Sequence, residues 1–337
     1  MSSTSKKMKS TQNEIIELDK QIINAQILKT GKYEKNGALV RKWEGETDSD
    51  SYIAQITKSN MSFIGILNGK FEREGYGLNN FSNGDQYFGY YENNKRNRHG
   101  IYFFSPQKKN NTIYEELYYG FWKENQKDNH GLYLWLNEPE NNYDFSKSNF
   151  DCYIGDIKED RFTKGTYLTK KNDEYYLYYG YFDENGRKSD KNALFYSSSD
   201  RLIKGEILND NFIEGYVAFF NSETGYLTNF NFCKFGIDGT VTNVKQEKDL
   251  IEEIGNVDQI KNEMNTFRNV ILEYDYFTNI YERYKEIREF IKDNMNTIEV
   301  LDDKDKFPEI IKLCVGYNSL NLFGEIEKKV YGQKSSI

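Results

Sequence analysis

The chain has 337 residues, a formal net charge of −8 and an aromatic content of 16%. Basic and acidic residues are mixed along it, which argues against non-specific binding to nucleic acid or anionic lipid. Cys152, Cys233 and Cys314 lie far apart without metal-binding spacing, which favours reduced thiols in a reducing compartment. Because neither an apolar leader nor a run of 18 apolar residues is present, we expect a cytoplasmic protein.

The first predicted element is a helix over residues 11–29. Thr11 to Glu14 fits a capping box, apolar residues follow at helical spacing, and Gly31 suits a C-cap. We assign residues 1–31 to a tail and this helix. Residues 32–62 are interpreted as a linker, in which Trp43 to Gly45 could open a degenerate repeat.

A pattern of tyrosine and glycine recurs over residues 63–242. Its units begin, in steps of 24, 31, 35, 25 and 25 residues, at Phe63, Tyr87, Tyr118, Tyr153, Tyr178 and Ile203. A degraded unit follows near residue 227. A recurring period of this length indicates a stack of one supersecondary unit, in which the extra residues of the two long steps form loops on one face.

Each unit is predicted to be two short strands joined by a turn. A glycine two residues after the first aromatic is expected to let the aromatic ring of the next hairpin lie on the backbone. These glycines are Gly65, Gly89, Gly120, Gly155, Gly180 and Gly205. A second set, expected to provide a positive φ or a close approach where the second strand begins, is Gly75, Gly100, Gly131, Gly165 and Gly215. Since one hairpin is only marginally stable, stacking predicts an elongated, locally coupled array.

Residues 243–337 are predicted to be helical. Apolar residues at steps of three and four from Leu250 to Met295 indicate an amphipathic helix of about 50 residues, with a break at Gly255 left open. A short helix from Pro308 and a last one over about 319–331 follow. The predicted fold class is therefore mainly β, a hairpin meander forming an elongated, ribbon-like sheet, with an N-terminal helix and a long C-terminal helical segment. Whether that segment packs in cis or in trans is also open.

The repeated unit resembles the MORN repeat. Phe63 to Lys70, followed by Gly75-Tyr76-Gly77 and Gly84, matches its pattern, and Tyr118 to Trp122 with His130-Gly131 matches its aromatic and His-Gly elements. The resemblance implies about six to seven β-hairpin repeats. It also implies a scaffold role in cytoskeletal structures such as ciliary axonemes and their radial spokes, with other protein subunits, another MORN protein or a second copy as partners. Some members of the family have been proposed to bind phosphoinositides.

No catalytic pattern stands out. The sequence shows no phosphate-binding glycine loop, nucleophile motif or Cys/His pair, so we expect no enzyme, no cofactor and no metal site. His99 and His130, the two histidines, share one repeat phase and are interpreted as structural. Carboxylates that could suggest a site are interpreted as solvated instead; they are Asp156, Glu159, Asp160, Glu263, Glu273, Glu282 and Glu286. The Asp302–Asp305 run resembles a calcium loop only superficially, because it lacks the ordered donors, the central glycine and the terminal glutamate.

The candidate functional surface is aromatic. Most first-strand aromatics are expected inside the stack, namely Tyr87, Tyr91, Tyr118, Trp122, Tyr153, Tyr178 and Phe182. The protein-interaction residues are expected to be outer tyrosines and helix aromatics, namely Tyr90, Tyr119, Tyr179, Tyr181, Phe267, Tyr274, Tyr281 and Tyr284.

The leading hypothesis is thus a non-catalytic scaffold of a large cytoskeletal complex, with a radial-spoke-like place in the ciliary axoneme. The alternative is a membrane-surface adaptor that binds phosphoinositides through the basic stretch Lys95–Arg98 and through Lys108–Lys109. Solvated turns are the favoured interpretation of those basic residues.

Overall fold

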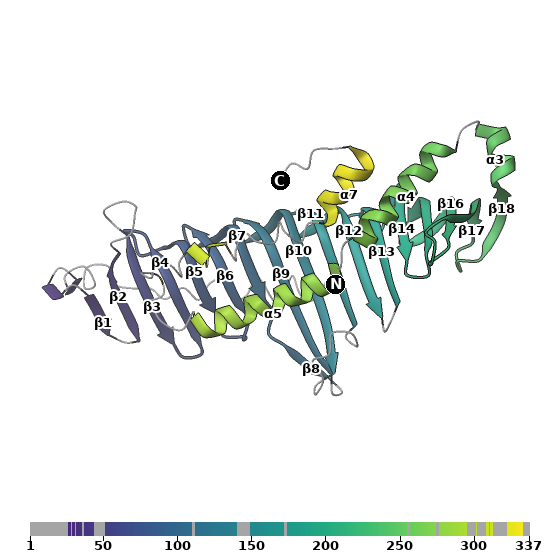
Figure 1. The fold of residues 1–337 in the computed structure, drawn as a ribbon. Coiled ribbons are helices and arrows are strands. Elements are labelled where there is room, and N and C mark those ends of the chain that lie inside the picture. Colours follow the sequence, from purple (N-terminus) through teal and green to yellow (C-terminus); the bar gives the residue numbers. More distant parts are fainter. Residues whose placement is uncertain are drawn as a thin grey trace. The chain divides into compact units, whose positions relative to one another are not determined.

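The computed structural model describes residues 26–27, 29–30, 32–35, 37–43, 51–109, 112–139, 149–171, 174–254, 257–273, 276–294, 301, 308–309, 311–312 and 322–332. This part of the chain is mainly β, with 18 strands in antiparallel pairs and four helices (Figure 1). It divides into two compact units. Unit 1 comprises residues 1–105, 122–125 and 285–316, and unit 2 comprises residues 106–121, 126–284 and 317–337.

Unit 1 is built on a meander in which each strand pairs with the next. Its strands are β1 (Lys32–Lys35), β2 (Ala38–Lys42), β3 (Tyr52–Lys58), β4 (Met61–Leu67), β5 (Arg73–Asn80), β6 (Gln86–Glu92) and β7 (Lys95–Phe103). Residues 32–62, expected as a linker, therefore contain three strands and the start of β4. The alternation of apolar and polar residues in each of these strands is short, so the strands were not recognised from the repeat pattern.

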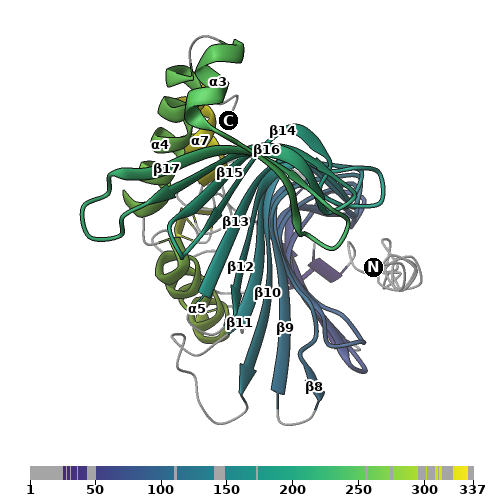
Figure 2. The ribbon, with the colours of Figure 1, turned by 90° about the vertical axis from the view of Figure 1, so that its right-hand side faces the viewer.

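Unit 2 continues the same plan with longer strands. They are β8 (Gln107–Lys109), β9 (Thr112–Lys123), β10 (Gln126–Pro139), β11 (Asn149–Lys158), β12 (Arg161–Lys171), β13 (Glu174–Tyr181), β14 (Asp190–Ser197), β15 (Arg201–Leu208), β16 (Asn211–Phe220), β17 (Leu227–Phe235) and β18 (Val241–Gln246). The last two residues of β9 belong to unit 1. The inserted residues lengthen β9 and β10 and add the short strand β8 at the strand ends (Figure 2). Where they are described, these residues therefore extend the strands, and the prediction that they form loops on one face is wrong for them.

The predicted long helix is interrupted. Three helices occupy its span, α3 (Glu247–Ile254), α4 (Asp258–Glu273) and α5 (Tyr276–Asn294), and Val257 between the first two is not helical. Residues 285–294 of α5 belong to unit 1, where Arg288 lies over the ring of Phe103 at 4.8 Å and Ile287 is buried.

The other predicted helices are described only in part. The final helix, α7 (Leu322–Tyr331), is close to its expected range. Residues 308–309 and 311–312 are helical, as are residues 26–27 and 29–30 at the end of the expected N-terminal helix. Residues 11–25, Gly31 and the Asp302–Asp305 run lie outside the described residues.

Glycines face one another across successive strands and define one face of each unit, the glycine face. In unit 1 the row runs through Gly65, Gly77, Gly89 and Gly100. In unit 2 it runs through Gly131, Gly155, Gly165 and Gly180. Since neighbouring residues of a strand point to opposite faces, the residues before and after each glycine lie on the other face, the helix face.

An aromatic ring lies against the glycine row, that of Phe63 at Gly65 and Gly77 and that of Tyr87 at Gly89 and Gly100. A Cβ built on Gly100 would come within 2.4 Å of the Tyr87 hydroxyl, and one on Gly89 within 2.5 Å of both that hydroxyl and the Cα of Gly100. The Tyr87 hydroxyl donates to the carbonyl of Tyr90 at 3.0 Å. For Gly89 the ring therefore comes from its own strand, two residues earlier, and not from the next hairpin as expected.

The second set of glycines is required mainly because neighbouring atoms lie close to the backbone, and less because of a positive φ. Only Gly75 in that set has a positive φ, of 79°, whereas Arg98 and Asn129 supply the positive φ just before Gly100 and Gly131. A Cβ on Gly131 would meet the ring of Tyr118 at 2.6 Å. Contact with a tyrosine ring thus explains Gly100, Gly131 and Gly165, whereas a Cβ on Gly215 would meet the backbone of Lys204 and Gly205.

Candidate interaction surfaces

Successive hairpins are joined by one recurring device, which we call the turn clasp. The two-residue turns Glu124–Asn125 and Glu159–Asp160 have positive φ at both positions, as type I′ turns require. The second turn residue bonds twice to a basic residue of the preceding hairpin. Asn125 donates its amide to the carbonyl of Arg96 at 3.0 Å, and its side chain accepts the amide of Arg96 at 2.8 Å.

Four clasps share this geometry. They are Arg73 with Asn94, Arg96 with Asn125, Lys127 with Asp160 and Lys188 with Asp210. Where the turn residue is asparagine, the arginine head also donates to its carbonyl at 3.0 Å. Where it is aspartate, a lysine ammonium lies 3.6 or 3.9 Å from the carboxylate. Each clasp therefore pairs matched side chains across two repeats.

The basic side chain of each clasp is enclosed by aromatic rings of the glycine face. Arg96 lies 4.3 Å from the ring centroid of Trp122 and 5.0 Å from that of Tyr102, and it is buried. Lys188 lies 4.7 Å from the ring of Tyr167, and burial lowers the pKa of its ammonium. Such cation–π contacts contribute about 0.5–2 kcal/mol each, so these cations stabilise the stack.

The predicted basic stretch is consequently not a free cationic cluster. Arg96 is 6% exposed beneath its rings, Lys95 is ion-paired with Glu124, and Arg98 lies 4.4 Å from the ring of Tyr90. Lys95 and Arg96 are thus engaged within the stack, whereas Arg98 and the two lysines of β8, Lys108 and Lys109, are exposed.

On the helix face of unit 2, α7 covers Tyr179. The ring of Tyr179 lies 5.6 Å from Tyr331 and 6.0 Å from Phe323, and its hydroxyl donates to Glu327. Burial, followed by this hydrogen bond, raises the pKa of the Tyr179 hydroxyl well above its usual value. The Lys164 ammonium lies 2.7 Å from the same carboxylate, so the buried charge of Glu327 is matched.

Helix α4 is held on the same face by two further ion pairs. Arg268 donates from Nε to Asp200 at 3.1 Å, and Asp200 also accepts the Tyr196 hydroxyl at 3.0 Å. Lys204 pairs with Glu263. Removing one member of a buried pair costs about 3–5 kcal/mol, so these contacts fix where α4 lies on the sheet.

The outer tyrosines do not form one open face. Tyr119 and Tyr179 are 1% and 2% exposed, whereas Tyr181 is 51% exposed and Tyr90 is half-buried. Sequence alternation placed all four on the face opposite the glycines, but the helices that cover part of it are remote in the chain. Tyr179 is therefore covered by a helix of its own chain and is not available to a partner.

Of the predicted helix residues, the two whose side chains are described are both buried. Phe267 of α4 is fully buried and lies 6.4 Å from Tyr179, and Tyr284 of α5 is buried. Tyr274 and the side chain of Tyr281 lie outside the described residues. For the two that can be placed, the apolar stripe of the helical region serves internal packing.

The histidines and turn carboxylates have local contacts. His130 Nδ1 lies 3.3 Å from an Asp156 oxygen, and its ring lies 5.6 Å from that of Phe323. His99 is half-buried, and burial lowers its pKa. Asp160 belongs to a clasp. No group of three His, Cys, Asp or Glu suited to a metal ion occurs among the described residues.

A further aromatic surface lies on the glycine face of unit 2, and we call it the aromatic stripe. Its members are half-buried and follow one another across the strands: Trp135, Phe162, Tyr167, Phe182, Phe195, Phe212 and Phe235. Neighbouring rings are in contact, with centroids 5.4 Å apart for Phe195 and Phe212 and 5.6 Å for Phe212 and Phe235. Of these residues, the sequence pattern singled out only Phe182, which was expected inside the stack.

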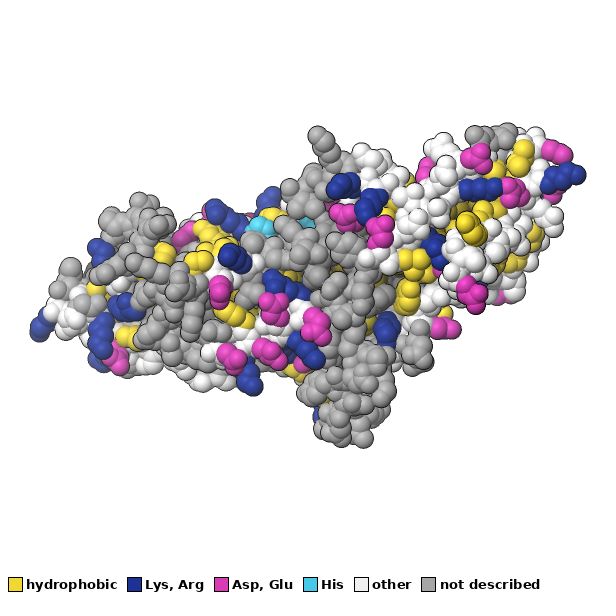
Figure 3. Space-filling model, in the orientation of Figure 1, with side chains coloured by type: hydrophobic (Ala, Val, Ile, Leu, Met, Phe, Trp, Pro, Cys, Tyr) yellow, Lys and Arg dark blue, Asp and Glu magenta, His cyan; other side chains and the backbone are white. Residues whose placement is uncertain are grey.

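The helix face differs in kind from the stripe. Around α3 and α4 the charges of both signs lie next to one another (Figure 3), as in the pairs Lys261 with Glu247 and Lys245 with Glu253. Among the helices that the structure describes, none is long and apolar enough to cross a membrane.

Comparison with known proteins adds no assignment. No protein-family model matches the chain, and no curated protein matches it significantly.

Proposed function

We propose that this protein is a non-catalytic scaffold that holds other protein subunits in a large cytoskeletal assembly. The observation that carries the proposal is the aromatic stripe of unit 2. Its rings are half-buried on the glycine face, while α4 and α7 pack on the opposite face (Figure 2). Aromatic side chains of this kind are enriched at the centres of protein interfaces.

The repeat architecture supports the same proposal. Four pairs of hairpins are joined by turn clasps, two of them in unit 2, and six of the seven stripe residues lie on paired strands. The resemblance of the unit to MORN repeats favours a ciliary axoneme, with a radial-spoke-like position, and makes another MORN protein or a second copy candidate partners.

The experiment is fractionation of ciliated cells that carry tagged full-length variants. We expect the unmodified chain to stay in the detergent-insoluble cytoskeletal pellet. Trp135→Lys on the stripe should release it, because a charge would be buried in the interface. Leu272→Lys on α4, where the leucine is 47% exposed, is the matched control and should remain in the pellet.

A third variant, Tyr181→Lys, changes the exposed tyrosine of the helix face. Its retention in the pellet is compared with that of the stripe variant, so that the contributions of the two faces are measured separately. Release of the unmodified chain by detergent alone would contradict the scaffold. It would favour instead the phosphoinositide adaptor, for which flotation with liposomes with and without phosphoinositide is the direct assay.

A further inference from the structure

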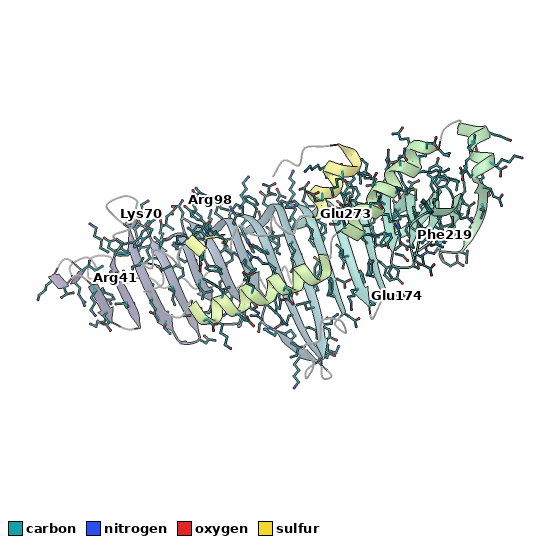
Figure 4. All side chains as sticks on the ribbon, viewed as in Figure 1. Arg41, Lys70, Arg98, Glu174, Phe219 and Glu273 are labelled. Carbon is teal, nitrogen blue, oxygen red and sulfur yellow. The ribbon has the colours of Figure 1, made fainter. Side chains whose placement is uncertain are left out.

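Exposed apolar side chains are concentrated in residues 208–251 of unit 2. Of the twelve large hydrophobic residues exposed in the described chain, nine lie between residues 208 and 251. They are Leu208, Ile213, Phe219, Tyr226, Leu227, Ile237, Val241, Val244 and Ile251. Phe219 is labelled in Figure 4, within the part of unit 2 formed by β16 to β18.

Two of these residues, Val241 and Val244, lie on β18, the last strand of the sheet in unit 2. β18 pairs with β17 over Val241–Gln246, and no described strand of unit 2 pairs with its other side (Figure 1). Five of its six residues are exposed. An edge strand of this kind presents unpaired backbone N–H and C=O groups, which another extended chain can satisfy.

A bulge in the β17–β18 pairing places Val241 and Val244 on the same face of the sheet. The register shifts between Lys234 and Phe235, so that Val241 lies opposite Phe235 and Val244 lies opposite Cys233. Cys233 in turn lies opposite Gly215, which places both valines on the glycine face. They are 51% and 53% exposed and continue the apolar surface of the stripe to the open edge.

The helix-face side of the edge is polar and already neutralised. Lys234 lies 3.1 Å from Glu214, and Lys245 lies 2.6 Å from Glu253. An added strand therefore meets apolar side chains on one side and compensated charges on the other. The partner that fits has apolar residues at alternate positions and uncharged polar residues between them.

The length of the edge favours a peptide over a second copy of the chain. Six residues span about 20 Å, which gives a strip of roughly 200 Å² per partner if a sheet is taken as about 10 Å thick. A stable dimer buries about 800 Å² per partner. A single extended segment needs less, because its main-chain hydrogen bonds supply the affinity.

We propose that β18 is a docking edge for an extended segment of another protein, which adds to the sheet as a further strand with its apolar side chains on the glycine face. This inference rests on the scaffold proposal for its biological meaning. Its chemistry is separate from that of the aromatic stripe and can be tested on the purified full-length chain alone.

The probe is a fluorescein-labelled peptide, Lys-Val-Thr-Val-Thr-Val-Thr-Val-Lys. We expect saturable binding by fluorescence anisotropy and slower amide exchange within residues 241–246. The same peptide with N-methyl groups on every second amide should bind at least about tenfold more weakly, since it cannot complete the ladder. This comparison needs no protein variant.

The second test uses a variant with two added charges on β18. Val241→Lys with Val244→Lys should weaken binding about tenfold or more, while Leu272→Lys should leave it unchanged. Equal binding of the methylated peptide, or binding that the double variant retains, would overturn the proposal. So would a dimer, seen by sedimentation and dissolved by the double variant, because the occupant would then be a second copy. Loss of peptide binding with normal cytoskeletal retention would reject this edge alone and leave the scaffold standing.

Discussion

At the scale of the residue, the fold depends on pairs of glycines that accept one tyrosine. Tyr118 lies over Gly120 and Gly131 and donates to the carbonyl of Phe121 at 2.8 Å. The same arrangement recurs with Tyr153, whose hydroxyl donates to the carbonyl of Asp156 at 2.6 Å. The glycines are thus required by the space that a neighbouring ring occupies.

The first prediction concerns Gly120→Val. Its Cβ would lie 2.6 Å from the Cα of Gly131 and 2.7 Å from the carbonyl oxygen of His130, where only backbone could move. We expect a loss of about 3 kcal/mol or more in unfolding free energy, measured by urea denaturation. Lys191→Val, at an exposed position of β14, should change it by less than about 0.5 kcal/mol. Equal effects would contradict the assignment of the glycine row.

At the scale of the element, the turn clasp explains how hairpins that are marginal alone become an ordered stack. It joins four of the turns to the hairpin before them, and its cation also fills the space between rings. The clasp uses basic and polar turn residues. In the sequence alone, such residues were interpreted either as solvated turns or as a phosphoinositide site.

The second prediction tests one clasp. Asn125→Ala removes the acceptor of the Arg96 amide and also places alanine at a φ of 72°. Glu124→Ala is the matched control, because its φ of 50° is also positive but its exposed ion pair with Lys95 contributes little. We expect Asn125→Ala to lower the melting temperature further, by the equivalent of about 1 kcal/mol. Indistinguishable melting temperatures would show that the clasp adds no stability.

At the scale of the whole molecule, tyrosine burial links stability to alkaline pH. Burial is the first cause that raises the pKa of the hydroxyls of Tyr102, Tyr153, Tyr167, Tyr178, Tyr179 and Tyr196. Each group is protonated in both states below about pH 10. Above that pH the unfolded chain loses these protons first, so the folded state becomes less stable as pH rises.

The third prediction follows from that sign. Unfolding free energy should be unaffected by these groups below about pH 10 and should fall steadily above it. Absorbance at 295 nm should show a group of tyrosines that ionise only when the chain unfolds. The reference is the chain in concentrated urea, where all 28 tyrosines should titrate together. A single step near pH 10 in the folded protein would be inconsistent with the buried rings.

By itself, the sequence determined the hairpin repeat and the burial of its leading aromatics. Strand alternation and the spacing of Tyr87, Tyr118, Tyr153 and Tyr178 from their glycines are local, and all four rings are buried as predicted. The helical character of the C-terminal region followed from local periodicity as well.

Only the tertiary structure decided which faces stay open. Alternation shows that two faces differ, but it does not show which one receives a helix from elsewhere in the chain. Tyr179 is covered because Glu327, 148 residues later, brings α7 onto Lys164. The stripe and the β18 edge likewise depend on the pairing register and on a bulge, which are set by contacts between strands and leave no local signature in the sequence.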